Sequence, residues 1–89
     1  MRTPSYAHQF ERDLRQMEKR GKNTQKIKAV IVALVSEETL PEQYRDHILV
    51  GNFKDRRECH IEPDWLLIHR LQDHEIVFER TGSHADLFR

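Results

Sequence analysis

The sequence predicts a single α+β domain, in which an N-terminal helical hairpin packs on a small antiparallel β-sheet. Apolar residues recur at helical spacing through residues 8–35, and strand-like runs fill residues 53–80. A chain of 89 residues leaves room for one hydrophobic core and therefore for one domain, residues 1–89. Helices that precede strands, instead of alternating with them, are typical of this class.

The helical half begins with residues 3–8, which we expect to form a short edge strand. The first helix spans residues 8–20, where Phe10, Leu14 and Met17 recur at helical spacing, and Gly21 is suited to end it. Asn23 or Thr24 then caps a second helix. Its core face is Ile27, Val30, Ile31, Leu34 and Val35. The short connection predicts an antiparallel hairpin.

The second half predicts three strands after a long loop, residues 36–52. The strands cover about residues 53–61, 65–71 and 76–80, and short breaks join them into an antiparallel meander. Alternation along the first strand places Cys59 inward, as a packed thiol and not a nucleophile. The run "WLLIHRL" predicts a central strand that is covered on both faces.

Composition excludes some classes of protein. Apolar runs do not approach the length of about 20 residues that a membrane span needs, and the N-terminus lacks an apolar signal core. We therefore expect a cytoplasmic protein. The single cysteine cannot form an internal disulfide, which agrees with a reducing compartment.

The net charge of zero hides a division along the chain. Residues 1–36 hold eight lysines and arginines against three acidic residues, and the remainder is acidic. The basic residues gather between positions 12 and 28. Two interpretations stand side by side: a solvated helical face, or a surface that contacts phosphates.

The predicted meander brings reactive residues to one edge of the sheet. His60 ends the first strand, Asp64 precedes the second, and Arg80 ends the third. His84 follows across a turn at Gly82. Since the end of one strand and the start of the next share an edge, we expect these side chains to converge.

Two histidines, an arginine and an aspartate suit metal-free RNA cleavage. Histidines exchange protons near neutral pH, arginine binds phosphate, and aspartate orients a histidine. The RNA supplies the nucleophile, its ribose 2′-OH. A zinc site built from His47, His60, Asp64 and His84 is the alternative, although no ligand pair has the close spacing of structural zinc sites. Trp65 is either core or a ring that flanks the site.

Two stretches, "RECHIEPDWLLIHRL" and "FERTGSHADLF", resemble the YafQ branch of the RelE-type toxins from bacterial toxin–antitoxin pairs. The resemblance covers almost the whole chain. It implies the RelE-like microbial RNase fold and a ribosome-dependent endonuclease that cuts mRNA in the ribosomal A site and inhibits translation. It further implies metal-independent cleavage without a cofactor, and a cognate DinJ/RelB-like antitoxin as partner.

The resemblance also implies the site residues. The catalytic set is His47, His60, Asp64, Arg80, His84 and Phe88. His47 enters through the resemblance alone, and Phe88 either stacks on a base or pins the tail to the core. The expected RNA- and ribosome-binding residues are Arg12, Arg15, Lys19, Arg20, Lys22, Lys26, Lys28, Lys54, Arg56 and Arg57.

His69 stands where relatives commonly carry a tyrosine, and we expect it, like His8 and His74, to lie at the surface. The alternative to a nuclease is a non-catalytic module on the same fold that binds RNA or a protein partner.

Overall fold

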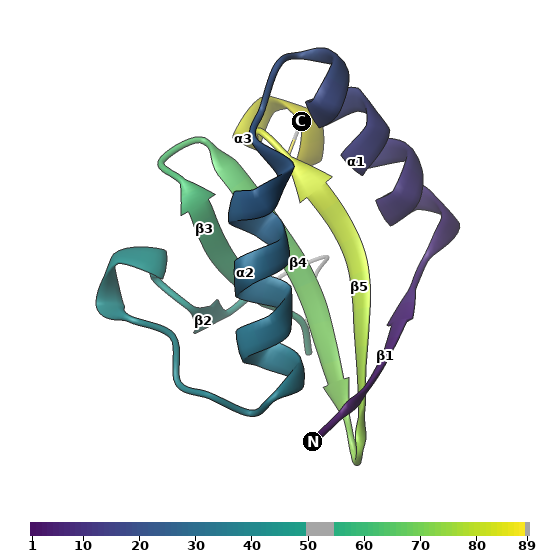
Figure 1. The fold of residues 1–89 in the computed structure, drawn as a ribbon, viewed down its shortest axis with the longest axis vertical. Helices are drawn as coiled ribbons and strands as arrows, with labels where there is room; N and C mark the ends of the chain where they lie inside the picture. Colours follow the sequence, from purple (N-terminus) through teal and green to yellow (C-terminus); the bar gives the residue numbers. More distant parts are fainter. Residues whose placement is uncertain (50–54, 89) are drawn as a thin grey trace.

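The computed structural model describes residues 1–49 and 55–88 (Figure 1). Its elements are β1 (Thr3–Tyr6), α1 (His8–Lys19), α2 (Thr24–Val35), a 3₁₀ turn (Glu42–Tyr44), β2 (His47–Ile48), β3 (Arg57–Glu62), β4 (Trp65–Gln72), β5 (Glu75–Gly82) and α3 (His84–Leu87). Within these residues, every helix is too short or too polar to cross a membrane.

The described strands form one sheet in the order β1-β5-β4-β3-β2. Strands β2 to β5 are antiparallel neighbours, so the predicted meander is confirmed. The edge strand expected near residues 3–8 is also present, but it pairs with β5 in parallel, with Thr3 opposite Glu75. The sheet is therefore mixed and not purely antiparallel. Parallel neighbours need a long crossover, and the intervening chain with both long helices provides it.

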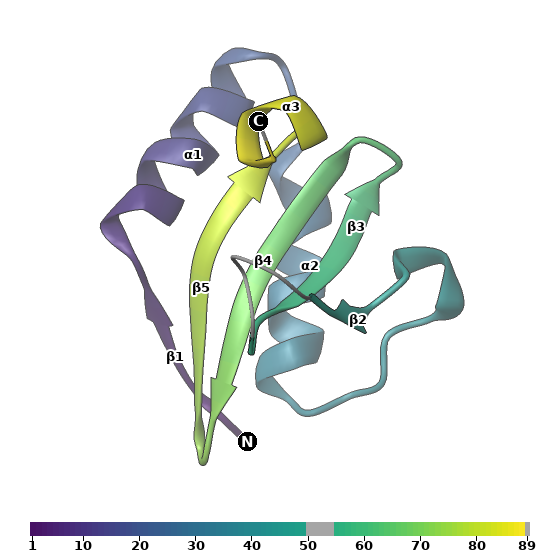
Figure 2. The ribbon, with the colours of Figure 1, turned by 180° about the vertical axis from the view of Figure 1, so that it is seen from behind.

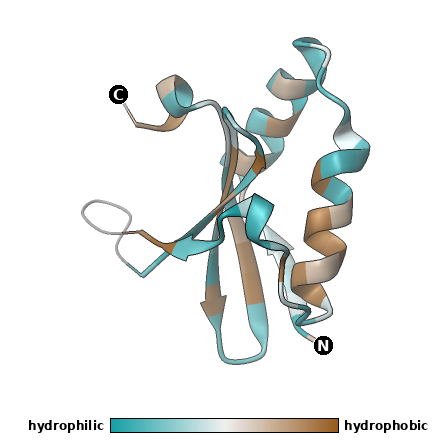
Figure 3. Cartoon of the chain, turned by 90° about the vertical axis from the view of Figure 1, so that its left-hand side faces the viewer, coloured by the Kyte–Doolittle hydropathy of each residue, from teal (hydrophilic) through white to brown (hydrophobic). Residues whose placement is uncertain are grey.

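Helices α1 and α2 cover one face of this sheet and run in opposite directions, which confirms the hairpin (Figures 1 and 3). Gly21 follows α1 with a φ of 85°, and Asn23 caps α2 by accepting the backbone N–H of Gln25 at 3.0 Å. Both helices contribute to one core. Its buried helical members are Phe10, Met17, Ile27, Val30 and Leu34.

Strand β4 is buried on both faces, as its apolar run predicts. Leu67 faces the helices, whereas Leu66 and Ile68 pack with Leu87 of α3 on the opposite face, here called the outer face (Figure 2). Figure 3 shows the same arrangement nearly edge-on, with α3 across the sheet from the two long helices. The small helix therefore covers one end of the outer face.

Trp65 and Cys59 both lie in the core beneath the helices. Trp65 is fully buried and its indole N–H donates to Thr81 Oγ1 at 2.9 Å, so it does not flank the site as an exposed ring. Burial raises the pKa of the Cys59 thiol to about 12, because a thiolate there would lose its hydration. The prediction of a packed, unreactive thiol is confirmed.

The segment between α2 and β3 differs from the single loop expected for residues 36–52. It contains the 3₁₀ turn after Pro41 and the two-residue strand β2, which pairs with β3. Elements this short leave no period in a sequence, so the pattern could not indicate them. Residues 50–54, including Lys54, lie outside the described part of the chain.

His69 lies in the core and not at the surface. Its side chain is fully buried, with its ring centroid 6.2 Å from that of Phe78. Alternation along β4 explains the placement, because His69 shares the helix-facing side with Trp65 and Leu67. Burial lowers the pKa of His69 to about 4.

Candidate active site

Three histidines from three elements line up on the outer face of the sheet. His47 lies on β2, His60 near the end of β3, and His84 at the start of α3. The ring centroids of His47 and His60 are 6.2 Å apart, and those of His60 and His84 are 5.8 Å apart. The Phe88 ring continues the row, with its centroid 6.3 Å from the ring centroid of His84. The structure thus brings together residues that are spread over 42 positions of the chain.

The helix α3 that carries His84 is fixed by its own polar groups. The Ser83 hydroxyl accepts the backbone N–H of Asp86 (3.1 Å), and the Asp86 carboxylate accepts that of Ser83 (2.9 Å). Leu87 is buried against β4, while Phe88 is 40% exposed. Leu87 therefore anchors the C-terminal segment, and Phe88 presents its ring to solvent beside His84.

The turn into α3 begins at Ser83, one residue later than expected. Gly82 is the last residue of β5 and is buried beneath α3. A Cβ atom at this position would lie 3.0 Å from Cβ and from Oδ2 of Asp86. Glycine is needed here because α3 approaches the strand so closely.

Asp64 orients His84. Its Oδ1 accepts the backbone N–H of His84 at 2.9 Å and lies 2.6 Å from Nδ1 of the ring. An ionised carboxylate only accepts hydrogen bonds, so the ring must direct an Nδ1 proton at it and leave Nε2 for exchange with a substrate. The backbone hydrogen bond first, and then the ring, lower the pKa of Asp64, which keeps it ionised.

Glu58 is a member of the cluster that sequence reasoning did not select. It is 5% exposed, with its carboxylate 3.4 Å from Nε2 of His60 and 4.0 Å from Nε2 of His47. The signal was available, because alternation along β3 places Glu58 on the same face as His60. Burial lowers the pKa of His60, although Glu58 opposes that effect.

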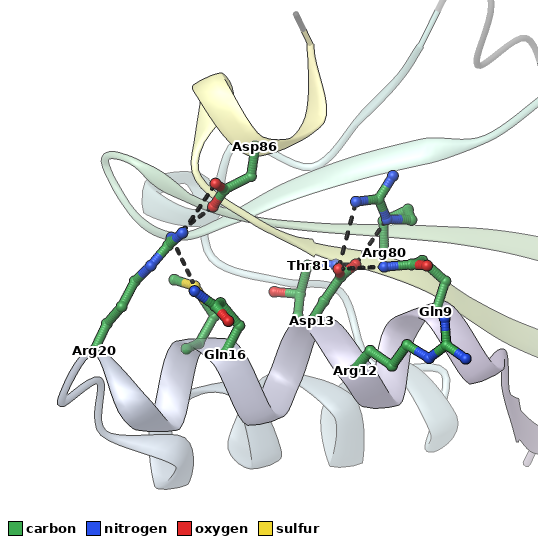
Figure 4. Close-up of a pocket in the computed structure, with 9 residues that line it drawn as sticks. Gln9, Arg12, Asp13, Gln16, Arg20, Arg80, Thr81 and Asp86 are labelled. Carbon is green, nitrogen blue, oxygen red and sulfur yellow. Dashed lines mark hydrogen bonds and ion pairs between the residues drawn. The ribbon is translucent and has the colours of Figure 1, made fainter.

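Arg80 borders the cluster and is not in contact with its histidines. On the outer face, Glu58 pairs with Ile68 and Ile68 with Arg80, so the Glu58 and Arg80 backbones are about 10 Å apart. The Arg80 guanidinium donates to Asp13 of α1, at 2.7 Å from Nε and 3.4 Å from Nη2 (Figure 4). The backbone N–H of Thr81 donates to the same carboxylate at 3.1 Å.

A pocket of about 320 Å³ opens beside this ion pair, between α1 and the end of β5. Figure 4 shows the side chains that surround it, among them Arg12, Arg20 and Asp86. Asp13 is one of three acidic residues on α1, and sequence reasoning did not select it as the partner of Arg80.

The predicted RNA-binding residues fall into two groups. Within the described residues, one group has neither an ion pair nor a side-chain hydrogen bond: Arg12, Arg15, Lys19 and Lys28. The other group forms ion pairs inside the molecule: Arg20 with Asp86, Lys22 and Lys26 with Glu62, Arg56 with Glu79, and Arg57 with Asp46. About half of the basic residues expected to bind RNA are therefore engaged in ion pairs within the protein.

The cluster also has the donor set of a metal site. Glu58, His60 and His84 each offer a ligand atom, and these atoms lie within 4.8 Å of one another. Two imidazoles and a carboxylate suit Zn²⁺ or Cu²⁺. This set differs from the zinc alternative drawn from the sequence, because Glu58 takes part and Asp64 is engaged with His84.

Comparison with known proteins identifies the family of the chain. The model of the bacterial toxin of type II toxin–antitoxin systems, YafQ, matches residues 2–89. The chain belongs to the YafQ toxin family. The mRNA interferase toxin YafQ of Escherichia coli K12 is 43% identical over 84 residues, which cover 93% of this chain and 91% of that toxin.

Solved structures of two bacterial toxins share the whole fold. The toxin in the crystal structure of the E. coli DinJ–YafQ complex has a TM-score of 0.93 and 41% identity, with both chains fully covered. A metal-bound toxin from Helicobacter pylori has a TM-score of 0.92 and 36% identity, with 99% of this chain and all of that chain covered. The α+β fold is thus the fold of YafQ toxins.

Proposed function

We propose that this chain is an endoribonuclease toxin that cleaves mRNA in the ribosomal A site and thereby inhibits translation. The observation that carries the proposal is the His84–Asp64 pair beside His60, which supplies oriented proton donors and acceptors. Family membership supports it, since the E. coli relative is an mRNA interferase. The substrate provides its own nucleophile, so the buried Cys59 has no role in the chemistry.

In this mechanism His60 accepts the proton of the ribose 2′-OH. Its pKa is lowered by burial, so the ring is neutral and able to accept at neutral pH. The 2′-oxygen then attacks the adjacent phosphorus, and the 5′-oxygen leaves. His84 gives that oxygen a proton from Nε2, while Asp64 holds the ring by Nδ1.

Arg80 and Phe88 act on the substrate beside the two histidines. Arg80 stabilises the charge that develops on the phosphate, after exchanging Asp13 for a phosphate oxygen. Phe88 stacks on a base of the mRNA, for which its exposed ring next to His84 is suited. His47 lies on the far side of His60 and lines the approach to that ring.

The partners follow from the family and from the free cations. Arg12, Arg15, Lys19 and Lys28 are exposed and offer contacts to ribosomal RNA backbone. A DinJ/RelB-like antitoxin binds and inhibits the toxin, since the E. coli relative has been solved in complex with DinJ.

A second role, binding of a transition metal, is favoured by Glu58, His60 and His84. A Zn²⁺ or Cu²⁺ ion held there would occupy the nitrogens that must exchange protons. Metal binding is therefore inhibitory in this proposal, and the H. pylori relative solved with bound metal supports such a site.

Substitution of His84 by alanine tests the proposal. We expect His84→Ala to abolish mRNA cleavage on programmed ribosomes and growth inhibition in cells, without a change in thermal unfolding. His74→Ala is the matched control, because His74 is an exposed histidine in the β4–β5 turn. A fully toxic His84→Ala would overturn the assignment. A non-catalytic binding module would stay active in this variant and lose function on charge reversal along residues 12–28.

A further inference from the structure

Arg20, at the end of α1, holds the helix that carries His84. Its guanidinium binds Asp86 through two parallel contacts, Nη1 to Oδ2 at 2.6 Å and Nη2 to Oδ1 at 3.0 Å (Figure 4). Asp86 lies two residues after His84 and also closes the capping box of α3. A bidentate pair of this kind fixes orientation as well as distance.

Lys22 and Lys26 hold the segment that carries Asp64 in a similar way. Both ammonium groups bind the Glu62 carboxylate, each to a different oxygen and each at 2.8 Å. Glu62 is the last residue of β3, two positions before Asp64. The two lysines lower the pKa of Glu62, so the carboxylate stays charged as pH falls.

His84 and Asp64 thus belong to two separate segments, and each segment is tied to the region where α1 ends and α2 begins. We propose that Arg20, Lys22 and Lys26 are positioning residues for the His84–Asp64 pair and not contacts to ribosomal RNA. This brace, as we name the three cations with Asp86 and Glu62, rests on the proposed nuclease function. It gives part of the basic segment a role inside the toxin.

The brace acts on geometry more than on stability. Its side chains are partly exposed, with 39% for Arg20 and 26% for Asp86, and ion pairs of this kind contribute little to folding. Proton transfer, in contrast, is sensitive to position, and a displacement of about 1 Å can cost on the order of 100-fold in rate. Loss of the brace should therefore lower the rate of cleavage while the fold persists.

The experiment compares glutamine variants, which remove the charge and keep an unbranched polar side chain. The brace variants are Arg20→Gln and the double variant Lys22→Gln/Lys26→Gln. The matched control is Lys19→Gln/Lys28→Gln, which removes two exposed cations from the same two helices. Single-turnover cleavage of mRNA at saturating ribosome concentration gives the rate, and titration of ribosomes gives the affinity.

We expect the brace variants to slow saturated cleavage by about 10-fold or more with unchanged ribosome affinity. The control should lower affinity and leave the saturated rate unchanged. Arg20→Lys should recover part of the rate, since it restores the charge without the bidentate geometry. Asp86→Asn combined with Arg20→Gln should be no slower than the slower single variant, because both changes break the Arg20–Asp86 contact.

The opposite pattern, weaker ribosome binding with a normal saturated rate, would overturn the brace and restore these residues to an RNA-contacting surface. A normal rate and affinity in both brace variants would overturn it as well. His84→Ala, measured in parallel, separates the two proposals. If His84→Ala cleaves normally, the nuclease assignment fails. If His84→Ala is inactive while the brace variants cleave normally, only the brace fails.

Discussion

A single carboxylate oxygen of Asp64 accepts the backbone N–H of His84 and contacts its ring Nδ1. The main-chain contact places the start of α3 against the β3–β4 turn, and the ring contact sets the direction in which Nε2 points. Positioning and tautomer selection are therefore performed by one group. Replacing that group tests how much of the activity depends on each.

Asp64→Asn should lower the saturated rate of cleavage by about 10- to 1,000-fold, because an amide oxygen accepts the backbone N–H but no longer provides the negative charge that faces the imidazole. Thermal unfolding should change little, since both side chains are largely exposed. Single-turnover kinetics with Asp64→Asn and Asp64→Ala provide the measurement. An Asn variant as active as the original chain would contradict a role for the charge of Asp64.

Glu58→Gln should move the acid limb of the pH–rate profile to lower pH. Glu58 raises the pKa of His60 through its charge, so its neutralisation lets burial lower that pKa further. A base with a lower pKa remains deprotonated in more acidic solution, and activity relative to the maximum should therefore increase near pH 5. Glu11→Gln, at an exposed position on α1, is the control. An unmoved acid limb would mean that His60 is not the base.

Zinc should inhibit cleavage, and a zinc-selective chelator in excess magnesium should restore it. Glu58→Gln should weaken Zn²⁺ binding by about 10-fold or more, because one of three ligands is lost. Calorimetric titration of the free toxin with Zn²⁺ measures the affinity independently of ribosomes. Activity that disappears with the chelator and returns with zinc would reverse the conclusion and make the metal a cofactor.

Gly82→Ala should reduce cleavage more than it reduces stability. The new methyl group would lie 3.0 Å from the Asp86 side chain and displace α3, which carries His84. Comparison of the single-turnover rate with the shift in the unfolding temperature separates the two effects. A loss of rate that merely follows the unfolded fraction at the assay temperature would argue against displacement of α3.

The elements that sequence could predict are those whose signal is local. The apolar face of α2 and the continuous run of β4 are visible within one window, and both are confirmed. The parallel pairing of Thr3 with Glu75 and the contact of Arg80 with Asp13 join residues about 70 positions apart. No local pattern indicates such pairs, because they depend on how the helices cross the sheet.

The histidine cluster was predictable for a different reason. A meander fixes which strand ends share an edge, so His60, Asp64 and His84 could be placed from the order of the strands alone. Two errors came from judging a residue by its type. Glu58 and His69 are polar, yet alternation along β3 and β4 places the first beside His60 and the second in the core.

His69→Leu should stabilise the protein, and more so at acid pH. The ring is fully buried and neither nitrogen has a hydrogen-bond partner among the described residues, so leucine removes a desolvation cost of about 1–3 kcal/mol. Burial is the main cause of the low pKa of His69, which falls to about 4. The charged groups that also act on the ring are Asp46, which raises the pKa, and Arg57 and Arg2, which lower it.

Between about pH 6.5 and pH 4 the unfolded chain binds a proton at His69 that the folded protein does not, so the free energy of unfolding decreases as pH falls. Across that interval, protonation of His69 in the unfolded chain lowers the free energy of unfolding by about 3 kcal/mol. His69→Leu should abolish this loss of stability. Urea unfolding at pH 7.5 and pH 5 measures the difference, with the exposed His74→Leu as control. An advantage of His69→Leu that is equal at both pH values would show that His69 titrates alike in the folded and unfolded chain.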